Sequence, residues 1–153
     1  MTHRMLSAEM QIHHVALRVA DAAASKAWFV AMLNFRVDRE FSFGGKDFVW
    51  LCPPERKAPV IELIGGGLLA SRPAYENPLD SLGQPGFHHI CLQVGDVEQV
   101  LSELRHRGVR ILIDVMAGAP GIGVEKGAFI ADPWGNIFEL LQLAHDSEPG
   151  AIG

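Results

Sequence analysis

Two kinds of repeated segment in this chain carry residues that could bind a metal ion. The segments IHHVALRVAD (12–21) and FHHICLQVGD (87–96) repeat a histidine doublet, and the apolar runs VIELI and IFELL each hold one glutamate, Glu62 and Glu139. An unpaired carboxylate inside an apolar strand is costly, whereas imidazoles and carboxylates together bind divalent cations. The repetition therefore predicts one metal site built from two histidines and two glutamates.

The alternation of side chains along a strand indicates which histidine of each doublet belongs to the site. The face that carries the first histidine is otherwise aliphatic, which predicts packing against a helix. The face that carries the second mixes small and polar side chains, which predicts the lining of a cavity. We therefore expect His14 and His89 to be metal ligands. His13 and His88 should face the helices, where replacing them would cost stability more than metal binding.

The elements that must position these residues form two similar halves. In each half a predicted strand, at 12–19 or 87–94, leads to an aspartate suited to cap a helix, Asp21 or Asp96. We expect helices at 24–33 and 97–107, and further strands at 35–43, 47–52, 58–64, 109–115, 127–131 and 137–143. The last two strands are joined by DPWG, whose residue types favour a turn. Each half is thus a predicted βαβββ module of an α+β protein.

The length of 153 residues suits a single domain, 1–153. Within it we expect module one at about 11–64, a connector at 65–86, module two at about 87–143 and a tail at 144–153.

The composition narrows the classes of partner. The net charge is −5 with both signs scattered, which argues against nucleic acid and anionic membranes. We find no apolar run long enough to span a membrane and no apolar leader, so we expect a cytoplasmic protein. The cysteines, Cys52 and Cys91, fit no motif, and we expect each to be a free, buried thiol.

In the order HVALRV, VIEL, HICLQV and ADPWGNIFEL, the chain resembles the vicinal oxygen chelate superfamily. That superfamily includes glyoxalase I, methylmalonyl-CoA epimerase, extradiol dioxygenases and the bleomycin and fosfomycin resistance proteins. The resemblance is greatest to glyoxalase I and the epimerase. It implies tandem βαβββ modules that form a cupped mixed β-sheet around one metal, ligands at His14, Glu62, His89 and Glu139, and a homodimer with the site in one chain or shared by two.

Such a ligand set predicts an enzyme of the glyoxalase type, a lyase or an isomerase. A divalent ion (Ni, Co, Zn, Mn or Fe) would hold a small bidentate carbonyl substrate and the enolate formed by proton transfer. Glu139 is the first candidate for the catalytic base and Glu62 the second. Candidate substrate-binding residues are Arg18, which matches an arginine of glyoxalase I, Lys126 and Trp50. No organic cofactor is evident.

Two other functions remain open. An Fe(II) extradiol-type dioxygenase would use His14, His89 and Glu139 and leave the place of Glu62 without a ligand, so the presence of Glu62 argues against it. A drug-binding resistance protein of the same superfamily is the other alternative.

Overall fold

The computed structural model describes residues 11–144 apart from 72 and 74. The chain divides into two compact units, Met1–Leu69 and Ala70–Gly153, and each is described by itself. The division falls within the predicted connector 65–86. Apart from Ala144, the predicted tail lies outside the described residues. The single domain therefore stays a prediction.

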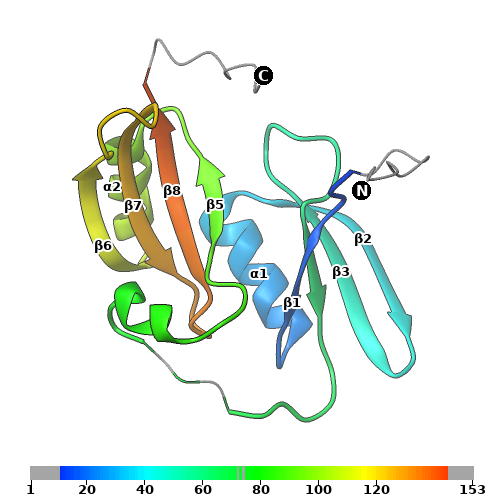
Figure 1. Ribbon diagram of the computed structural model, residues 1–153. Coiled ribbons are helices and arrows are strands. Elements are labelled where there is room, and N and C mark those ends of the chain that lie inside the picture. The colour runs from blue at the N-terminus through cyan, green and yellow to red at the C-terminus, as the bar shows by residue number, and fades with distance from the viewer. Residues whose placement is uncertain (1–10, 72, 74, 145–153) are drawn as a thin grey trace, which may run out of the picture. The chain divides into compact units, whose positions relative to one another are not determined.

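Each unit contains the predicted order of strand, helix and three strands (Figure 1). The first unit comprises β1 (Val15–Arg18), α1 (Ala22–Leu33), β2 (Arg36–Phe43), β3 (Lys46–Cys52) and β4 (Ile61–Ile64). The second comprises the 3₁₀ helix η1 (Pro78–Gly83), β5 (Ile90–Gln93), α2 (Val97–His106), β6 (Arg110–Ala117), β7 (Val124–Ala131) and β8 (Ile137–Leu143). The α+β class and the tandem βαβββ repeat are confirmed, and η1 was not foreseen.

The order of strands in each sheet brings the ends of the repeat together. The first sheet runs β1-β4-β3-β2 and the second β5-β8-β7-β6. In both, the first and last strands of the repeat pair in parallel, which sets Ala16 beside Glu62 and Cys91 beside Glu139. A histidine that leads into the first strand is therefore close to the glutamate of the last strand, although about fifty residues of chain separate them.

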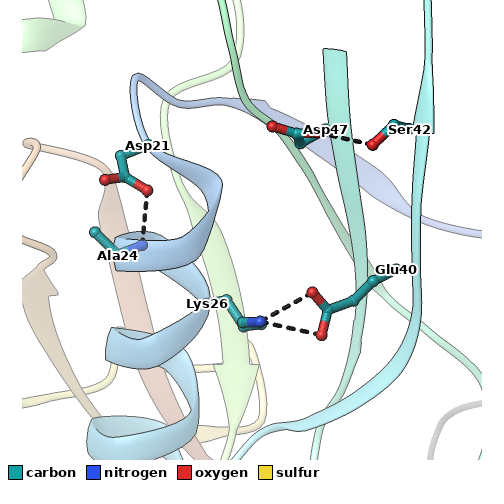
Figure 2. A network of polar contacts seen from close by, with 6 residues as sticks. All are labelled: Asp21, Ala24, Lys26, Glu40, Ser42 and Asp47. Carbon is teal, nitrogen blue, oxygen red and sulfur yellow. Dashed lines mark hydrogen bonds and ion pairs between the residues drawn. The ribbon is translucent and has the colours of Figure 1, made fainter. Parts of the chain in front are cut away.

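Both long helices begin at the predicted caps. The Asp21 carboxylate accepts a hydrogen bond from the backbone N–H of Ala24 at 2.9 Å (Figure 2), and Asp96 caps α2 in the same way. These bonds satisfy N–H groups that have no partner inside the helix. Lys26 of α1 forms an ion pair with Glu40 of β2 (Figure 2). The distance between the Lys26 nitrogen and a Glu40 oxygen is 2.9 Å. The start and the side of α1 are thus tied to its own unit.

The core of each unit lies between the helix and one face of the sheet. Ile61 and Leu63 of β4 are buried on that face, as are Phe138 and Leu140 of β8. Buried side chains from the helices complete the two cores: Trp28 and Phe29 from α1, and Leu101 and Leu104 from α2. Because side chains alternate along a strand, the glutamate between each buried pair projects from the opposite face. We call this face the site face of each unit.

The predicted turn between the last two strands is confirmed. Asp132 is 2% exposed, and its Oδ1 accepts the backbone N–H groups of Trp134 at 2.9 Å and Asn136 at 2.8 Å. Gly135 has φ of 84°, a conformation that glycine adopts without strain. The turn sets the register in which Phe129 lies opposite Glu139.

Two further expectations concern membranes and thiols. Among the described residues, no helix combines the length and apolar character needed to cross a bilayer. Both cysteines are free, as expected, and Cys52 is buried. The expected burial of Cys91 was wrong, because Cys91 is exposed. Because side chains alternate along β5, Cys91 projects from the face opposite Ile90 and Leu92. It pairs with Glu139, which lies on the site face.

Candidate metal centre

In the first unit, His14 and Glu62, two of the candidate ligands, form a pair. His14 directly precedes β1, and its Nε2 lies 3.4 Å from Oε2 of Glu62 on β4. The other carboxylate oxygen, Oε1, accepts a hydrogen bond of 2.8 Å from the indole Nε1–H of Trp50. Trp50 occupies the β3 position opposite Glu62, and its ring lies 5.9 Å from the His14 ring between centroids. Trp50 thus holds the carboxylate and contacts the imidazole.

In the second unit, His89 and Glu139 form the equivalent pair. Nε2 of His89 lies 3.1 Å from Oε2 of Glu139. Phe129 is opposite Glu139 on β7, and its ring packs edge-on against His89 with 5.4 Å between centroids. The aromatic position is kept from the first unit, but phenylalanine has no hydrogen-bond donor for the carboxylate.

Cys91 of β5 is the register partner of Glu139 on the edge of β8 that faces away from β7. Although Cys91 as a whole residue is exposed, partial desolvation of its sulfur, followed by the negative charge of Glu139 and a hydrogen bond to it, raises the pKa of the Cys91 thiol to about 11. The thiol is therefore a neutral neighbour of the carboxylate near neutral pH.

The two pairs fit a divalent ion in donor type and in spacing. Nitrogen and oxygen ligands lie about 2.1 Å from such an ion. At that bond length, the 3.1 Å separation of His89 and Glu139 corresponds to an angle of about 95° at the ion, close to neighbouring ligands of an octahedron. The 3.4 Å separation of His14 and Glu62 corresponds to about 108°, near a tetrahedral angle. Each pair can therefore chelate one ion from one side.

The four predicted ligands are brought together as two pairs. In the part of the chain that the structure describes, no group of three or more histidine, cysteine, aspartate or glutamate side chains is placed so that it could hold a metal ion. The pairs come from equivalent strands, as the repeat predicts.

The prediction that strand alternation separates the two histidines of each doublet was wrong. Both doublets lie just before their strands, which begin at Val15 and Ile90. In each, the first ring contacts the second: Nδ1 of His13 lies 2.7 Å from Nδ1 of His14, and the matching distance in the second doublet is 2.8 Å. Outside a regular strand, neighbouring side chains need not point to opposite faces.

Two residues of η1 that the sequence did not single out contact the second doublet. Nε2 of His88 lies 2.7 Å from Oγ of Ser81 and 2.9 Å from the carbonyl oxygen of Pro78. Both belong to the segment predicted as a connector, and neither has a residue type or spacing that indicates a metal site. Asn77 at the cap of η1, followed by proline, is the only local sign of order there.

The predicted substrate-binding residues have partners within their own units. The guanidinium of Arg18 donates to the backbone carbonyls of Ile64 and Gly66, where β4 ends. Lys126 forms an ion pair with Glu98 of α2, with 3.1 Å between nitrogen and oxygen, and so lies on the helix side of its sheet. Trp50 is part of the first ligand pair.

Comparison with known proteins gives a family match over most of the chain. A family model described as Glyoxalase/Bleomycin resistance protein/Dioxygenase superfamily matches residues 11–140. One curated relative, an ethylmalonyl-CoA/methylmalonyl-CoA epimerase of Cereibacter sphaeroides, is 27% identical over 115 residues, which cover 74% of this chain and 80% of the epimerase.

Solved structures show the same fold. The trypanothione-dependent glyoxalase I of Leishmania major is 26% identical with a TM-score of 0.63, over 88% of this chain and 87% of that one. A glyoxylase/bleomycin resistance protein/dioxygenase domain from Frankia sp. EAN1pec superposes with a TM-score of 0.69 at 17% identity, over 92% of this chain and 96% of that one. The relatives thus include enzymes, and the two solved structures share the fold of this chain.

Proposed function

The chain belongs to the Glyoxalase/Bleomycin resistance protein/Dioxygenase superfamily, and we propose that it is a metal-dependent enzyme that transfers a proton at the carbon next to a carbonyl group. The observation that carries the proposal is the matched placement of one imidazole and one carboxylate in each unit, His14 with Glu62 and His89 with Glu139. In this proposal the two pairs together hold one divalent ion, with both pairs supplied by one chain or by two copies in a homodimer.

The bound ion would supply Lewis acidity, which polarises a carbonyl and makes the neighbouring C–H more acidic. The chain must then supply a base for that proton and return it. Glu139 suits this role, because no tryptophan N–H occupies the position opposite it. Glu62 is held through Oε1 by Trp50 and suits the role of a fixed ligand. We therefore assign proton transfer to Glu139 first and to Glu62 second, giving a lyase or an isomerase.

The placement of Glu62 also bears on the dioxygenase alternative. A dioxygenase triad leaves this position without a ligand, whereas Oε2 of Glu62 lies 3.4 Å from Nε2 of His14. This proximity supports a four-ligand site and favours the proton-transfer enzyme.

The substrate we propose is a small carbonyl compound that chelates through two neighbouring oxygens. The epimerase relative acts, by its name, on ethylmalonyl-CoA and methylmalonyl-CoA, so these thioesters are the first substrates to test. The second is the adduct of a thiol with a 2-oxoaldehyde, which carries two adjacent oxygens and an acidic C–H. Arg18, Trp50 and Lys126 stay predicted substrate-binding residues, although all three have partners within their units.

The test is metal loading followed by proton exchange. The purified protein is stripped of metal, titrated with Ni²⁺, Co²⁺, Zn²⁺, Mn²⁺ or Fe²⁺, and incubated with each substrate in D₂O, with and without O₂. We expect one bound ion for each complete set of His14, Glu62, His89 and Glu139. We also expect deuterium to appear at the carbon next to the carbonyl, whether or not O₂ is present. If no ion binds, the metal site is refuted; if a catechol consumes O₂ instead, the enzyme is a dioxygenase.

A further inference from the structure

We propose that His88 is a positioning residue that sets the tautomer of His89, so that the lone pair of His89 Nε2 is directed towards the metal. This inference rests on the proposed metal site. It assigns a role to the first histidine of the second doublet and to the η1 segment that contacts it, neither of which ligates the ion.

The backbone carbonyl of Pro78 determines which nitrogen of the His88 ring carries the proton. A carbonyl oxygen can only accept a hydrogen bond, and this one lies 2.9 Å from Nε2 of His88. The hydroxyl of Ser81 donates to the same carbonyl at 2.6 Å, so the Ser81 oxygen, 2.7 Å from His88 Nε2, is also free to accept. Both neighbours of Nε2 are therefore acceptors, and Nε2 carries the proton of the His88 ring.

The tautomer of His88 fixes the direction of the hydrogen bond between the two imidazole rings. A neutral imidazole has one N–H and one lone pair, so Nδ1 of His88 is an acceptor. It lies 2.8 Å from Nδ1 of His89, which must then be the donor. The lone pair of neutral His89 is left on Nε2, the atom 3.1 Å from Oε2 of Glu139. Two acceptors directed at one another in this way call for a cation.

The residues that hold His88 are themselves buried in the fold of the second unit. Ser81 is 7% exposed, Pro78 is buried, and both belong to η1, which is part of the same unit. Partners that hold the second ring nitrogen of a ligand histidine fix its tautomer and orientation, and their loss typically weakens metal binding 10–100-fold. The connector therefore contributes to the site through His88.

Histidine tautomers can be read directly by NMR in the full-length protein. In ¹⁵N-histidine-labelled, metal-free protein at about pH 8, where histidine is ordinarily neutral, long-range ¹H–¹⁵N correlation spectra distinguish N–H from bare ring nitrogens. We expect a proton on Nε2 of His88 and on Nδ1 of His89. A proton on Nδ1 of His88 would overturn the inference, whether or not the protein binds metal.

Zinc affinity of three variants gives the second readout. His88→Leu removes the acceptor and should weaken Zn²⁺ binding 10–100-fold in a chelator competition. His88→Asn keeps an oxygen acceptor near the place of Nδ1 and should restore most of the affinity. His106→Leu is the matched control, since it makes the same change at a histidine of α2 whose Nδ1 contacts the Ser102 carbonyl of its own helix, and it should bind as the wild type does. His88→Leu binding as tightly as His88→Asn would refute the role.

The two readouts separate this inference from the proposed function. If the wild type binds no Zn²⁺, the metal site fails, whatever the tautomers are. If it binds Zn²⁺ and His88 carries its proton on Nδ1, only the positioning role fails. Circular dichroism of each variant shows whether His88→Leu remains folded; if it does not, the wild-type NMR spectrum decides alone.

Discussion

The two units hold the same pair of ligand groups by opposite means. In the first unit the carboxylate is restrained, because Trp50 donates to Oε1 of Glu62. In the second unit the imidazole is restrained, because His88 links the ring of His89 to η1. The first unit thus restrains the carboxylate of its pair, and the second unit restrains the imidazole.

The equivalent positions in the other unit lack these restraints. Phe129 stands opposite Glu139, where the first unit has Trp50. His13 is exposed, and within residues 11–69 its Nε2 has no hydrogen bond corresponding to those of His88. We therefore propose that the two halves divide the tasks of their ligands, with Glu62 as the fixed ligand and Glu139 as the residue that moves a proton.

Removing each carboxylate gives the largest test of this division. Glu139→Gln keeps the size of the side chain but removes the base, and it should lower the deuterium exchange rate 10²–10⁴-fold at saturating metal. Glu62→Gln should act mainly on metal affinity and leave more of the exchange rate. Exchange measured by mass spectrometry checks both; a larger loss of rate in Glu62→Gln would reverse the assignment.

The Cys91 thiol can report on the electrostatic surroundings of Glu139. The first unit has no such group, because Ala16 occupies the equivalent position beside Glu62. A pKa of about 11, raised from 9.0, means that the neutral thiol is favoured and the thiolate forms only at higher pH. Below pH 9 the thiolate fraction of Cys91 should be about a hundredfold lower than that of a free cysteine.

Alkylation of metal-free protein by iodoacetamide, followed by peptide mapping, measures this difference. Glu139→Gln removes the charge that is the second cause of the shift, and it should speed the alkylation of Cys91. An unchanged rate would mean that burial alone protects the sulfur.

Exchanging the aromatic residues should exchange the restraint on the carboxylates. Trp50→Phe removes one hydrogen bond to a charged group, which is worth about 1.5–3 kcal/mol, and should lower Zn²⁺ affinity by about tenfold or more. Phe129→Trp places an indole opposite Glu139 and should slow proton exchange while leaving the ion bound. Calorimetric titration and exchange kinetics report the two effects separately. Equal effects on both readouts would show that the aromatic position does not distinguish the units.

Replacing His13, the first histidine of the first doublet, gives the smallest expected effect. His13→Leu removes a ring that contacts His14 at 2.7 Å between nitrogens but lacks an anchor like η1. It should therefore weaken Zn²⁺ binding less than His88→Leu does, in the same chelator competition. Equal losses would show that both doublets set tautomers in the same way.

Much of the fold could be predicted because its signals are local. Apolar alternation, an aspartate before each helix and a DPWG turn act over two to four residues, and the caps at Asp21 and Asp96 form as expected. The two glutamates were recognisable because a carboxylate in an apolar strand needs a partner. The error over the doublets arose at strand ends, where alternation no longer applies and the strands begin later than expected.

What the sequence by itself determined is the doubled βαβββ order and the four candidate ligands, His14, Glu62, His89 and Glu139, since both follow from repeated patterns with a physical cost attached. Tertiary structure alone decided which atoms restrain them. The Trp50 indole donates to Glu62 from the neighbouring strand, and the Pro78 carbonyl, ten residues earlier in the chain, lies within hydrogen-bond distance of His88. Such bonds depend on side-chain rotamers and on segments that strand pairing brings together from different parts of the chain. Neither can be predicted from the spacing of residues in the sequence.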